Sequence, residues 1–566
     1  MTVLNVRDFD PAAARRLVTE GMPAPLARAL AARGITSVAQ TRLMLEGLLA
    51  PAELSHVDHA AALLADAIEA DARLLIVADY DCDGATACAV GIRGLRAMGA
   101  RVDYLVPNRF EYGYGLTPEI VDLAAAGGAE KQPHLLITVD NGIASVEGVA
   151  RAHELGMSVL ITDHHLPGAV LPAAACIVNP NQPGCGFPSK HLAGVGVMFY
   201  VLLALRAELR SRGKFDIATQ PRLDHLLDLV ALGTVADVVR LDNNNRTLIT
   251  QGLQRIRQGR LHAGIAALFQ VAGKDARVAQ ARDLGFAIGP RINAAGRLTD
   301  MTVGIECLIT DSFERAVELA RQLDQLNRGR RDIEGDMQLD ALAALEHADV
   351  ESRSTICLYD ESWHQGVIGL VASRVKEKYH RPTIAFARGA DGELRGSGRS
   401  IDGVHLRDTL DLVTKFDSSL VRRFGGHAMA AGLTMPFESY ERFVSAFESA
   451  TCDSCDRSLF ERSVTTDGPL AAGELVLSLI EAIDSHVWGQ GFPAPLFDNE
   501  FVVIEQRLVK DRHLRLVLDL DGRKIEAIWF ARTEQLPRTV RLAYRPAFDE
   551  YMGTRRLQLV IEHAAL

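Results

Sequence analysis

The sequence lacks any stretch of about 18 consecutive apolar residues, which is what a helix needs to span a bilayer. Its first residues also lack the basic segment and apolar core of a secretion signal. We therefore expect a cytoplasmic protein without membrane contact. Cysteine is sparse too: the eight cysteines are scattered over 566 residues and do not form a disulfide framework.

The chain also lacks an excess of positive charge. It carries 61 Lys and Arg against 72 Asp and Glu, a formal net charge of −11. This balance argues against a uniformly basic nucleic-acid-binding surface, because phosphate binding usually shows as clustered Lys and Arg. It is compatible with a local groove in which divalent cations supply the missing positive charge.

Five short apolar runs, each ending in polar residues, organise the first third of the chain. Runs of this kind are typical of strands that are buried on both faces, and helical stretches separate them. Alternating strands and helices predict an α/β fold with a doubly wound parallel sheet. The strands are expected at residues 74–79, 102–107, 134–140, 158–163 and 175–180.

Three aspartates follow the first of these strands: Asp79, Asp81 and Asp83. In an extended segment, residues two apart share a side, so the three carboxylates are expected to project together. Their mutual repulsion favours bound cations. An EF-hand loop starting at Asp79 would need Glu at its twelfth position, where this chain has Val90. A solvated acidic turn stays open as the alternative.

Two later segments also suit a metal. Asp163 is followed by His164 and His165 at the end of the fourth strand, where adjacent histidines can bind a metal and a substrate oxyanion side by side. Asp237 lies in an apolar helical run, where an unpaired carboxylate is costly, so we expect a cation beside it. Asp228, earlier in that run, is expected to be a solvated helix position.

The order of these motifs resembles the DHH phosphoesterase superfamily: DYDCDG at 79–84, VDNG at 139–142, DHH at 163–165 and GTVAD at 233–237. Further motifs resemble its RecJ branch, the bacterial exonucleases specific for single-stranded DNA. They are PNRFEYGYGLTPE at 107–119, GPRINAAGRL at 289–298, WHQGVIGLVASR at 363–374, GSGRS at 396–400 and GGHAMAAG at 425–432.

The resemblance implies a catalytic site with two divalent cations, Mn²⁺ or Mg²⁺. Two cations agree with the number of carboxylates, and such a pair suits phosphodiester hydrolysis by stabilising both the attacking and the leaving oxygen. The implied metal ligands are Asp81, Asp83, Asp140, His164 and Asp237, and the other catalytic residues are Asp163 and His165.

Substrate contacts are expected from a loop with two arginines, from two glycine-rich segments that can surround a phosphate, and from a tyrosine that can stack on a base. For Tyr112 and Tyr114, packing is an equally good interpretation. The expected substrate-binding residues are Asn108, Arg109, Tyr114, Arg291, Asn293, Arg297, His364, Gln365, Ser397, Arg399, Gly425, Gly426 and His427.

Five parts are expected along the chain: a helical appendage (1–50), a DHH catalytic domain (51–310), a helical connector (311–350), a second α/β domain called DHHA1 (351–457) and a C-terminal module (458–566). The module contains five β-like runs, which fits an OB-like β-barrel that grips single strands. A structural barrel is the alternative. The runs are at 500–509, 513–520, 523–530, 539–544 and 556–561.

The resemblance implies a 5′→3′ exonuclease that degrades single-stranded DNA to 5′-mononucleotides in DNA repair and recombination. It also suggests a single-strand-binding protein and a repair helicase as partners. Two alternatives stay open: a phosphodiesterase for short oligonucleotides or cyclic dinucleotides, and a non-catalytic replication scaffold. The β module argues against the first because so small a substrate does not need it, and the intact acids and histidines argue against the second.

Overall fold

The protein is described by a computed structural model that covers all residues except 1–2, 129–130, 347, 390–391, 550–554 and 566, and except the side chains of Arg109 and Phe110. The chain folds into two compact units. Unit 1 consists of Met1–Val38, Gly329–Ile483 and Pro495–Leu566, and unit 2 of Ala39–Arg328 and Asp484–Ala494. Within the described part, every helix is too short or too polar to cross a bilayer.

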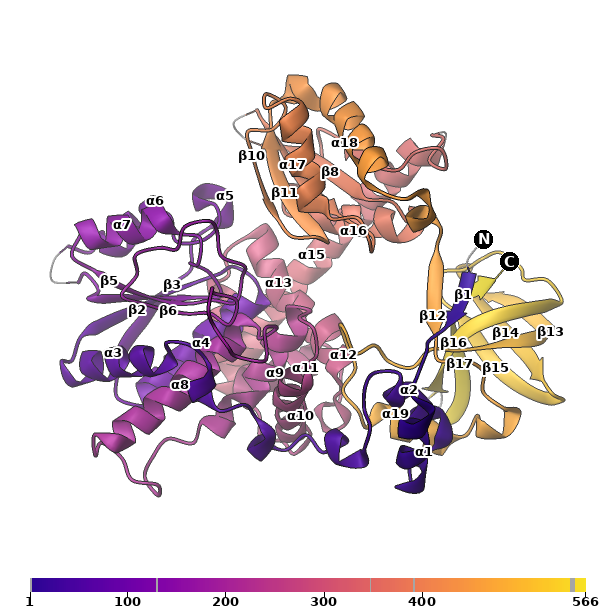
Figure 1. The fold of residues 1–566 in the computed structure, drawn as a ribbon, viewed down its shortest axis with the longest axis horizontal. Helices are drawn as coiled ribbons and strands as arrows, with labels where there is room; N and C mark the ends of the chain where they lie inside the picture. Colours follow the sequence, from indigo (N-terminus) through magenta and orange to yellow (C-terminus); the bar gives the residue numbers. More distant parts are fainter. Residues whose placement is uncertain (1–2, 129–130, 347, 390–391, 550–554, 566) are drawn as a thin grey trace. The chain divides into compact units, whose positions relative to one another are not determined.

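Unit 2 contains a five-stranded parallel sheet (Figure 1). Its strands have the order β3-β2-β4-β5-β6. The strand order reverses beside β2, which makes the carboxyl end of β2 and β4 the switch point where ligands bind in such sheets. All five predicted strands are confirmed. They are β2 (Arg73–Ala78), β3 (Arg101–Leu105), β4 (Leu135–Val139), β5 (Ser158–Thr162) and β6 (Cys176–Val178).

Helices cover both faces of this sheet (Figure 1). On one face lie α3 (Val57–Glu69), α4 (Cys82–Ala97) and α8 (Gly194–Ser211). On the other lie α6 (Pro118–Ala125) and α7 (Val146–Glu154). The start of α6 follows from its sequence, because Thr117 Oγ1 accepts the Ile120 N–H and Pro118 suits the first helical position.

The rest of unit 2 is helical. A short helix, α5 (Arg109–Tyr112), lies between β3 and α6. After α8 come α9 (Leu227–Ala236), α10 (Asn243–Arg257), α11 (Ala263–Val271), α12 (Ala281–Asp283), the π-helical turn Leu284–Ile288, α13 (Gly289–Leu298) and α14 (Thr302–Ile309). The long helix α15 (Phe313–Glu346) then carries the chain from unit 2 into unit 1, as its sequence pattern predicts.

Helix α9 is apolar on all sides and buried, and it corrects one expectation. Asp228 is fully buried, so the prediction of a solvated position is wrong. Its Oδ1 lies 2.8 Å from His262 Nδ1, and its Oδ2 accepts the His262 backbone N–H at 2.7 Å. A carboxylate is tolerated in this apolar helix because a residue 34 positions away supplies its donors.

Unit 1 contains the second predicted α/β domain. Its mixed sheet has the order β10-β11-β9-β8-β7, in which only the β7–β8 pair is parallel. The strands are β7 (Ile356–Tyr359), β8 (Thr383–Arg388), β9 (Leu394–Arg399), β10 (Arg423–Gly426) and β11 (Ala430–Met435). One face packs against α17 (Leu406–Phe416) and α18 (Tyr440–Ser454), and α16 (Ile368–Tyr379) lies against β8 and β9.

The predicted C-terminal β-barrel is also confirmed. Five strands close in the order β13-β14-β15-β17-β16. They are β13 (Phe497–Val509), β14 (His513–Leu520), β15 (Arg523–Trp529), β16 (Thr539–Asp549) and β17 (Arg556–Ala565). β13 pairs with β16 along its first half and with β14 along its second. The β13–β14 ladder shifts register between Val503 and Glu505, and an irregularity of this kind bends a strand.

The N-terminal segment is not purely helical, so the expected helical appendage needs correction. It begins with β1 (Val3–Val6), which pairs in parallel with β12 (Ser463–Thr466), before α1 (Pro11–Thr19) and α2 (Ala24–Ala31). Nearby, the buried Arg33 guanidinium lies 2.6 Å from Asp467. A four-residue strand with a partner some 460 positions away leaves no local pattern that sequence reasoning can detect. The predicted domain boundaries stay predictions.

One short segment of the C-terminal region belongs to unit 2. Residues 484–494, which we call the strap, follow α19 (Leu477–Asp484) and precede the barrel. The Leu241 N–H donates to the Gln490 carbonyl at 2.7 Å. The Arg246 guanidinium carbon lies 3.9 Å from the centroid of the Phe492 ring. The strap therefore packs on the α9–α10 connection and on the start of α10.

Candidate metal centre

The aspartates after β2 are placed by a turn into a helix. Asp81 caps α4, where its Oδ1 accepts the Gly84 N–H at 3.0 Å, and Asp83 lies in the first helical turn. The expectation of one extended segment is therefore wrong, because the chain becomes helical at Cys82. Gly84 permits this tight turn: a Cβ at that position would lie 2.6 Å from the Asp79 carbonyl oxygen.

Asp83 is fixed at the N-terminus of α8. Its Oδ2 accepts the Gly194 N–H at 2.6 Å, and its Oδ1 accepts the Val195 N–H at 3.0 Å. These donors stabilise the carboxylate, yet burial and the nearby charge of Asp81 outweigh them and raise the pKa of Asp83 to about 7. The carboxylate therefore needs a cation to be fully ionised at neutral pH.

Asp140 follows β4 in a left-handed backbone conformation, with φ of 63°. Gly194 permits its close approach, because a Cβ there would lie 2.6 Å from the Asp140 Cβ. Burial, then the charges of Asp83 and Asp81, raises the pKa of Asp140 well above its ordinary value. Burial and the same two neighbours raise the pKa of Asp237, the residue that ends α9.

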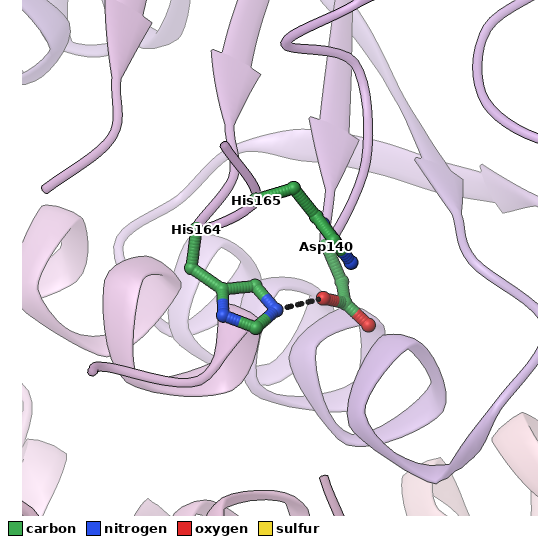
Figure 2. A group of neighbouring side chains, drawn as sticks. All are labelled: Asp140, His164 and His165. Atoms are coloured by element: carbon green, nitrogen blue, oxygen red, sulfur yellow. Dashed lines mark ion pairs between the residues drawn. The ribbon is translucent and has the colours of Figure 1, made fainter. Parts of the chain in front are cut away.

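His164 is the residue that these carboxylates share. Its Nε2 lies 3.0 Å from Asp140 Oδ1, and Figure 2 shows the ring pointing at that carboxylate. The same Nε2 is 3.5 Å from Asp237 Oδ2 and 4.0 Å from Asp83 Oδ2. The residues that the structure brings together here are those expected from the sequence.

The side chains form three overlapping groups in which all potential ligand atoms lie within 4.8 Å of one another. Asp140 and His164 each belong to two groups, so the geometry suits two neighbouring cations. The buried carboxyls with raised pKa values fit cations chemically, because bound positive charge removes the repulsion that raises them. The groups are Asp140–His164–His165, Asp83–His164–Asp237 and Asp79–Asp81–Asp140.

Asp79 was missing from the expected ligands, although it belongs to the third group. The signal for it was present in the sequence, because it alternates with Asp81 and Asp83. Asp79, Asp83 and Asp140 are buried, which contradicts the alternative of a solvated acidic turn.

Asp163 has a different position from the other acids. Its Oδ2 accepts the Ile143 N–H at 2.9 Å, and its Oδ1 lies 2.7 Å from His165 Nδ1. Burial opposes ionisation of Asp163, but the hydrogen bond and charge of His165 dominate and lower its pKa. Burial likewise opposes protonation of His165, and Asp163 overcomes it, raising the pKa of His165 to about 9. Asp163 therefore holds the His165 ring in place.

Comparison with known proteins agrees with this geometry. The sequence matches the DHH family, N-terminal domain, over residues 73–234, the DHHA1 domain over 352–451 and the RecJ OB domain over 466–563. It is 47% identical over 561 residues to the single-stranded-DNA-specific exonuclease RecJ of Escherichia coli (strain K12), and the match covers 96% of each chain. The chain belongs to the RecJ family.

More distant RecJ proteins are similar over nearly the whole chain. RecJ of Bacillus subtilis (strain 168) is 32% identical, with 96% of this chain and 68% of that protein covered. The crystal structure of Thermus thermophilus RecJ in complex with Mn²⁺ matches with a TM-score of 0.84 at 29% identity, covering 100% of this chain and 80% of that one. Its complex with Mg²⁺ matches with a TM-score of 0.79 at 28% identity.

Among the expected substrate residues of unit 2, some lie beside the metal cluster and others make contacts elsewhere in the unit. Tyr114 Oη lies 3.3 Å from His165 Nε2 and the ring is half exposed, whereas Tyr112 packs against the hydrophobic core. Asn108 Nδ2 lies 3.3 Å from Glu111 Oε1. The Arg109 side chain lies outside the described residues.

The loop that was expected to contact phosphate is in fact the helix α13. Of its three predicted substrate residues, two make structural contacts within unit 2. The buried Arg291 guanidinium lies 2.8 Å from Asp324 Oδ1. Asn293 Oδ1 accepts the Cys82 N–H at 2.7 Å, so it fixes the turn between two metal-site aspartates. Arg297 is half-buried near the end of the helix.

In unit 1, the expected residues cluster on one region of the RecJ-type DHHA1 sheet. Ser397 and Arg399 share a face of β9 next to Gly369 at the start of α16, where a Cβ would lie 2.8 Å from both side chains. Burial lowers the pKa of Arg399. Gly432 pairs with Ser397 on one side and with Gly425 on the other, so two neighbouring positions beside Ser397 carry no side chain.

The remaining predicted residues border the same sheet. His427 follows β10, where its N–H donates to the Ala430 carbonyl at 2.8 Å, and Gly426 before it has φ of 140°. His364 and Gln365 precede α16, and the His364 ring accepts the Gly366 N–H at 3.1 Å. Ser397 and Arg399 therefore bring a hydroxyl and a guanidinium together beside Gly369, and both groups suit contact with a phosphate.

Proposed function

We propose that this RecJ-family protein is a metal-dependent exonuclease that degrades single-stranded DNA. The observation that carries the proposal is the position of His164 Nε2, within 4.0 Å of the carboxylates of Asp83, Asp140 and Asp237. A buried cluster of this composition suits two Mn²⁺ or Mg²⁺ ions. Single-stranded DNA is proposed as the substrate because the chain is highly identical to proteins named single-stranded-DNA-specific exonucleases.

In the proposed site, the two cations are held by six side chains: Asp79, Asp81, Asp83, Asp140, His164 and Asp237. When bound, the cations neutralise the phosphodiester charge and activate water for its hydrolysis. The N-terminus of α8 holds Asp83 in place, and Asp163 holds His165. Asp163 orients the His165 ring beside the proposed cations, where the imidazole is available to contact a phosphate oxygen.

Cleavage runs 5′→3′ and releases 5′-mononucleotides in DNA repair and recombination, in the cytoplasm. The DHHA1 surface around Ser397 and Arg399 holds a substrate phosphate, and the barrel grips the single strand. A single-strand-binding protein and a repair helicase are the proposed partners, because the substrate arises where duplex DNA is opened.

The test is digestion of single-stranded DNA, duplex DNA and single-stranded RNA labelled at either end, with Mn²⁺, Mg²⁺ or a chelator. We expect metal-dependent loss of single-stranded DNA, with a 5′ label released as mononucleotide from the start and a 3′ label retained on long products. Cleavage of only the shortest oligonucleotides would favour the small-substrate phosphodiesterase, and no cleavage with either metal would favour the scaffold.

A further inference from the structure

Phe286 is the most exposed large hydrophobic side chain in the part of the chain that the structure describes, at 81% of its full area. Its neighbours Leu284 and Ile288 are fully buried. A lone exposed Leu or Val is common on protein surfaces, but a phenyl ring held out between two core residues leaves a large apolar area in water. This exposure needs an explanation.

The backbone around Phe286 holds the ring in this position. Residues Leu284–Ile288 form a π-helical turn, a rare geometry that is frequent at functional sites. The Ala287 carbonyl accepts Arg291 Nη1 at 2.5 Å, and Asp324 holds the same guanidinium. The backbone of the turn is therefore held by Arg291.

This turn lies against the segments that carry the metal ligands. A Cβ on Gly285 would lie 3.2 Å from Val235 Cγ1, and one on Gly289 would lie 3.1 Å from Ala236 Cβ. Asp237 follows these two residues directly. The helix that continues from the turn also fastens the Asp81–Asp83 turn, through the hydrogen bond from the Cys82 N–H to Asn293.

We propose that Phe286 is a stacking platform for one unpaired base of the DNA strand whose phosphate lies at the metal centre. This inference rests on the proposed function. A base offers its face to a phenyl ring whatever its identity, so the contact suits an enzyme without sequence preference. In a duplex, neighbouring base pairs cover both faces of each base. Phe286 therefore favours single strands over duplexes.

A nucleobase fits this surface better than a protein partner does. A stable protein interface buries on the order of 1,000 Å² or more, whereas the apolar area here is one ring. Val238, directly after Asp237, is also exposed and adds a second small apolar contact at the edge of the metal cluster.

The test compares Phe286→Ala and Phe286→Trp with the wild type on single-stranded oligonucleotides, including a series with one abasic position moved along the strand. We expect Phe286→Ala to lower kcat/KM and DNA affinity by about 5- to 150-fold, and Phe286→Trp to retain both. At one position of the series, the abasic site should lower the kcat/KM and DNA affinity of the wild type by the same factor. At that position it should cause no further loss in Phe286→Ala. Ile217→Ala, at an exposed loop residue with 80% of its area accessible, is the matched control and should change nothing.

Binding measured by fluorescence anisotropy in a chelator separates the two proposals, because it needs no cleavage. If the wild type binds single-stranded DNA but does not degrade it, the proposed function fails while the binding data still test Phe286. The inference is wrong if Phe286→Ala equals the wild type, if Phe286→Trp loses as much as Phe286→Ala, or if abasic sites weaken both proteins equally at every position.

Discussion

At the scale of single residues, the metal centre is an arrangement of mutually unfavourable charges. Asp83, Asp140 and Asp237 have raised pKa values because they are buried beside one another. Only small residues allow this crowding, since a Cβ on Gly194 would collide with Asp140. Bound cations remove this repulsion.

We expect Asp140→Ala and His164→Ala each to lower the rate of DNA cleavage by about 100-fold or more at saturating Mn²⁺, because each side chain belongs to two ligand groups. Both residues lie at strand ends, so circular dichroism should show a folded protein. The control is Asp103→Ala, whose side chain is 87% exposed and which should keep full activity. Near-normal cleavage by either site variant would show that the ligand assignment is wrong.

The same pKa shifts predict how stability depends on pH. Without metal, Asp83 has a pKa of about 7 when folded against an ordinary value of 3.8, so the folded state binds protons that the unfolded state releases in this window. Stability should therefore fall as the pH rises from about 4 to above 7. We expect the melting temperature in chelator to drop by about 2–4 °C or more between pH 5 and pH 8, and Mn²⁺ to raise it most at pH 8.

Asp83→Asn provides the comparison for this effect. The amide cannot ionise, so the fall in melting temperature should flatten while other titrating groups still contribute. A wild-type melting temperature that rises with pH in chelator would contradict the prediction, as would identical pH profiles for the two proteins.

At the scale of elements, the strap completes the region that follows Asp237. Arg246 is buried, and burial lowers its pKa to about 10. Its Nε and Nη2 have no hydrogen-bond partner among the described residues, so the Phe492 ring is a principal contact of this cation. The Leu241–Gln490 hydrogen bond fastens the same stretch. An element distant in sequence thus fixes the connection between α9 and α10.

Phe492→Ala should destabilise unit 2 by about 3–5 kcal/mol, because it removes a buried ring and exposes the Arg246 guanidinium. Chemical unfolding followed by tryptophan fluorescence measures this, since Trp488 stacks on Phe492 with ring centroids 5.2 Å apart. Phe530→Ala, at an exposed barrel position, should stay within about 0.5 kcal/mol of the wild type. A similarly small change for Phe492→Ala would mean that the strap does not stabilise unit 2.

At the scale of the whole molecule, the barrel and the strap are separable parts of the C-terminal region. A chain that ends after Ala494 keeps the strap and loses the barrel, whereas one that ends after Arg457 loses both. The shorter chain also loses β12 and Asp467, the partners of β1 and Arg33. The two truncations should therefore differ in more than DNA binding.

We expect the chain that ends after Ala494 to bind DNA of tens of nucleotides more weakly, with a flatter salt dependence, because fewer phosphate-bound cations are displaced. It should still cleave very short oligonucleotides. The chain that ends after Arg457 should lose activity on both substrates because unit 2 is incomplete. The controls for the chain that ends after Ala494 are its solubility and its binding of Mn²⁺. If the chain that ends after Ala494 lost equal activity on long and short DNA, the barrel would have a structural role. Unchanged activity on both substrates would favour a small-oligonucleotide hydrolase.

Much of this protein follows from local sequence. The five strands of unit 2 were predictable because a strand buried on both faces must be a continuous Leu, Ile and Val run, and its end is marked by the first polar residue. Several carboxylates and a His-His pair at those ends point to cations for the same local reason. The five barrel strands were predictable from short β-like runs separated by turns.

Tertiary structure alone decided the features that depend on residues far apart in the chain. Nothing near Asp228 indicates that His262 will cover it, and nothing in Val3–Val6 indicates a partner at Ser463–Thr466. The same holds for the strap on Arg246 and for the exposure of Phe286. Local patterns record which side chains must leave water, whereas the choice of partner is made by packing between segments whose separation in sequence carries no signal.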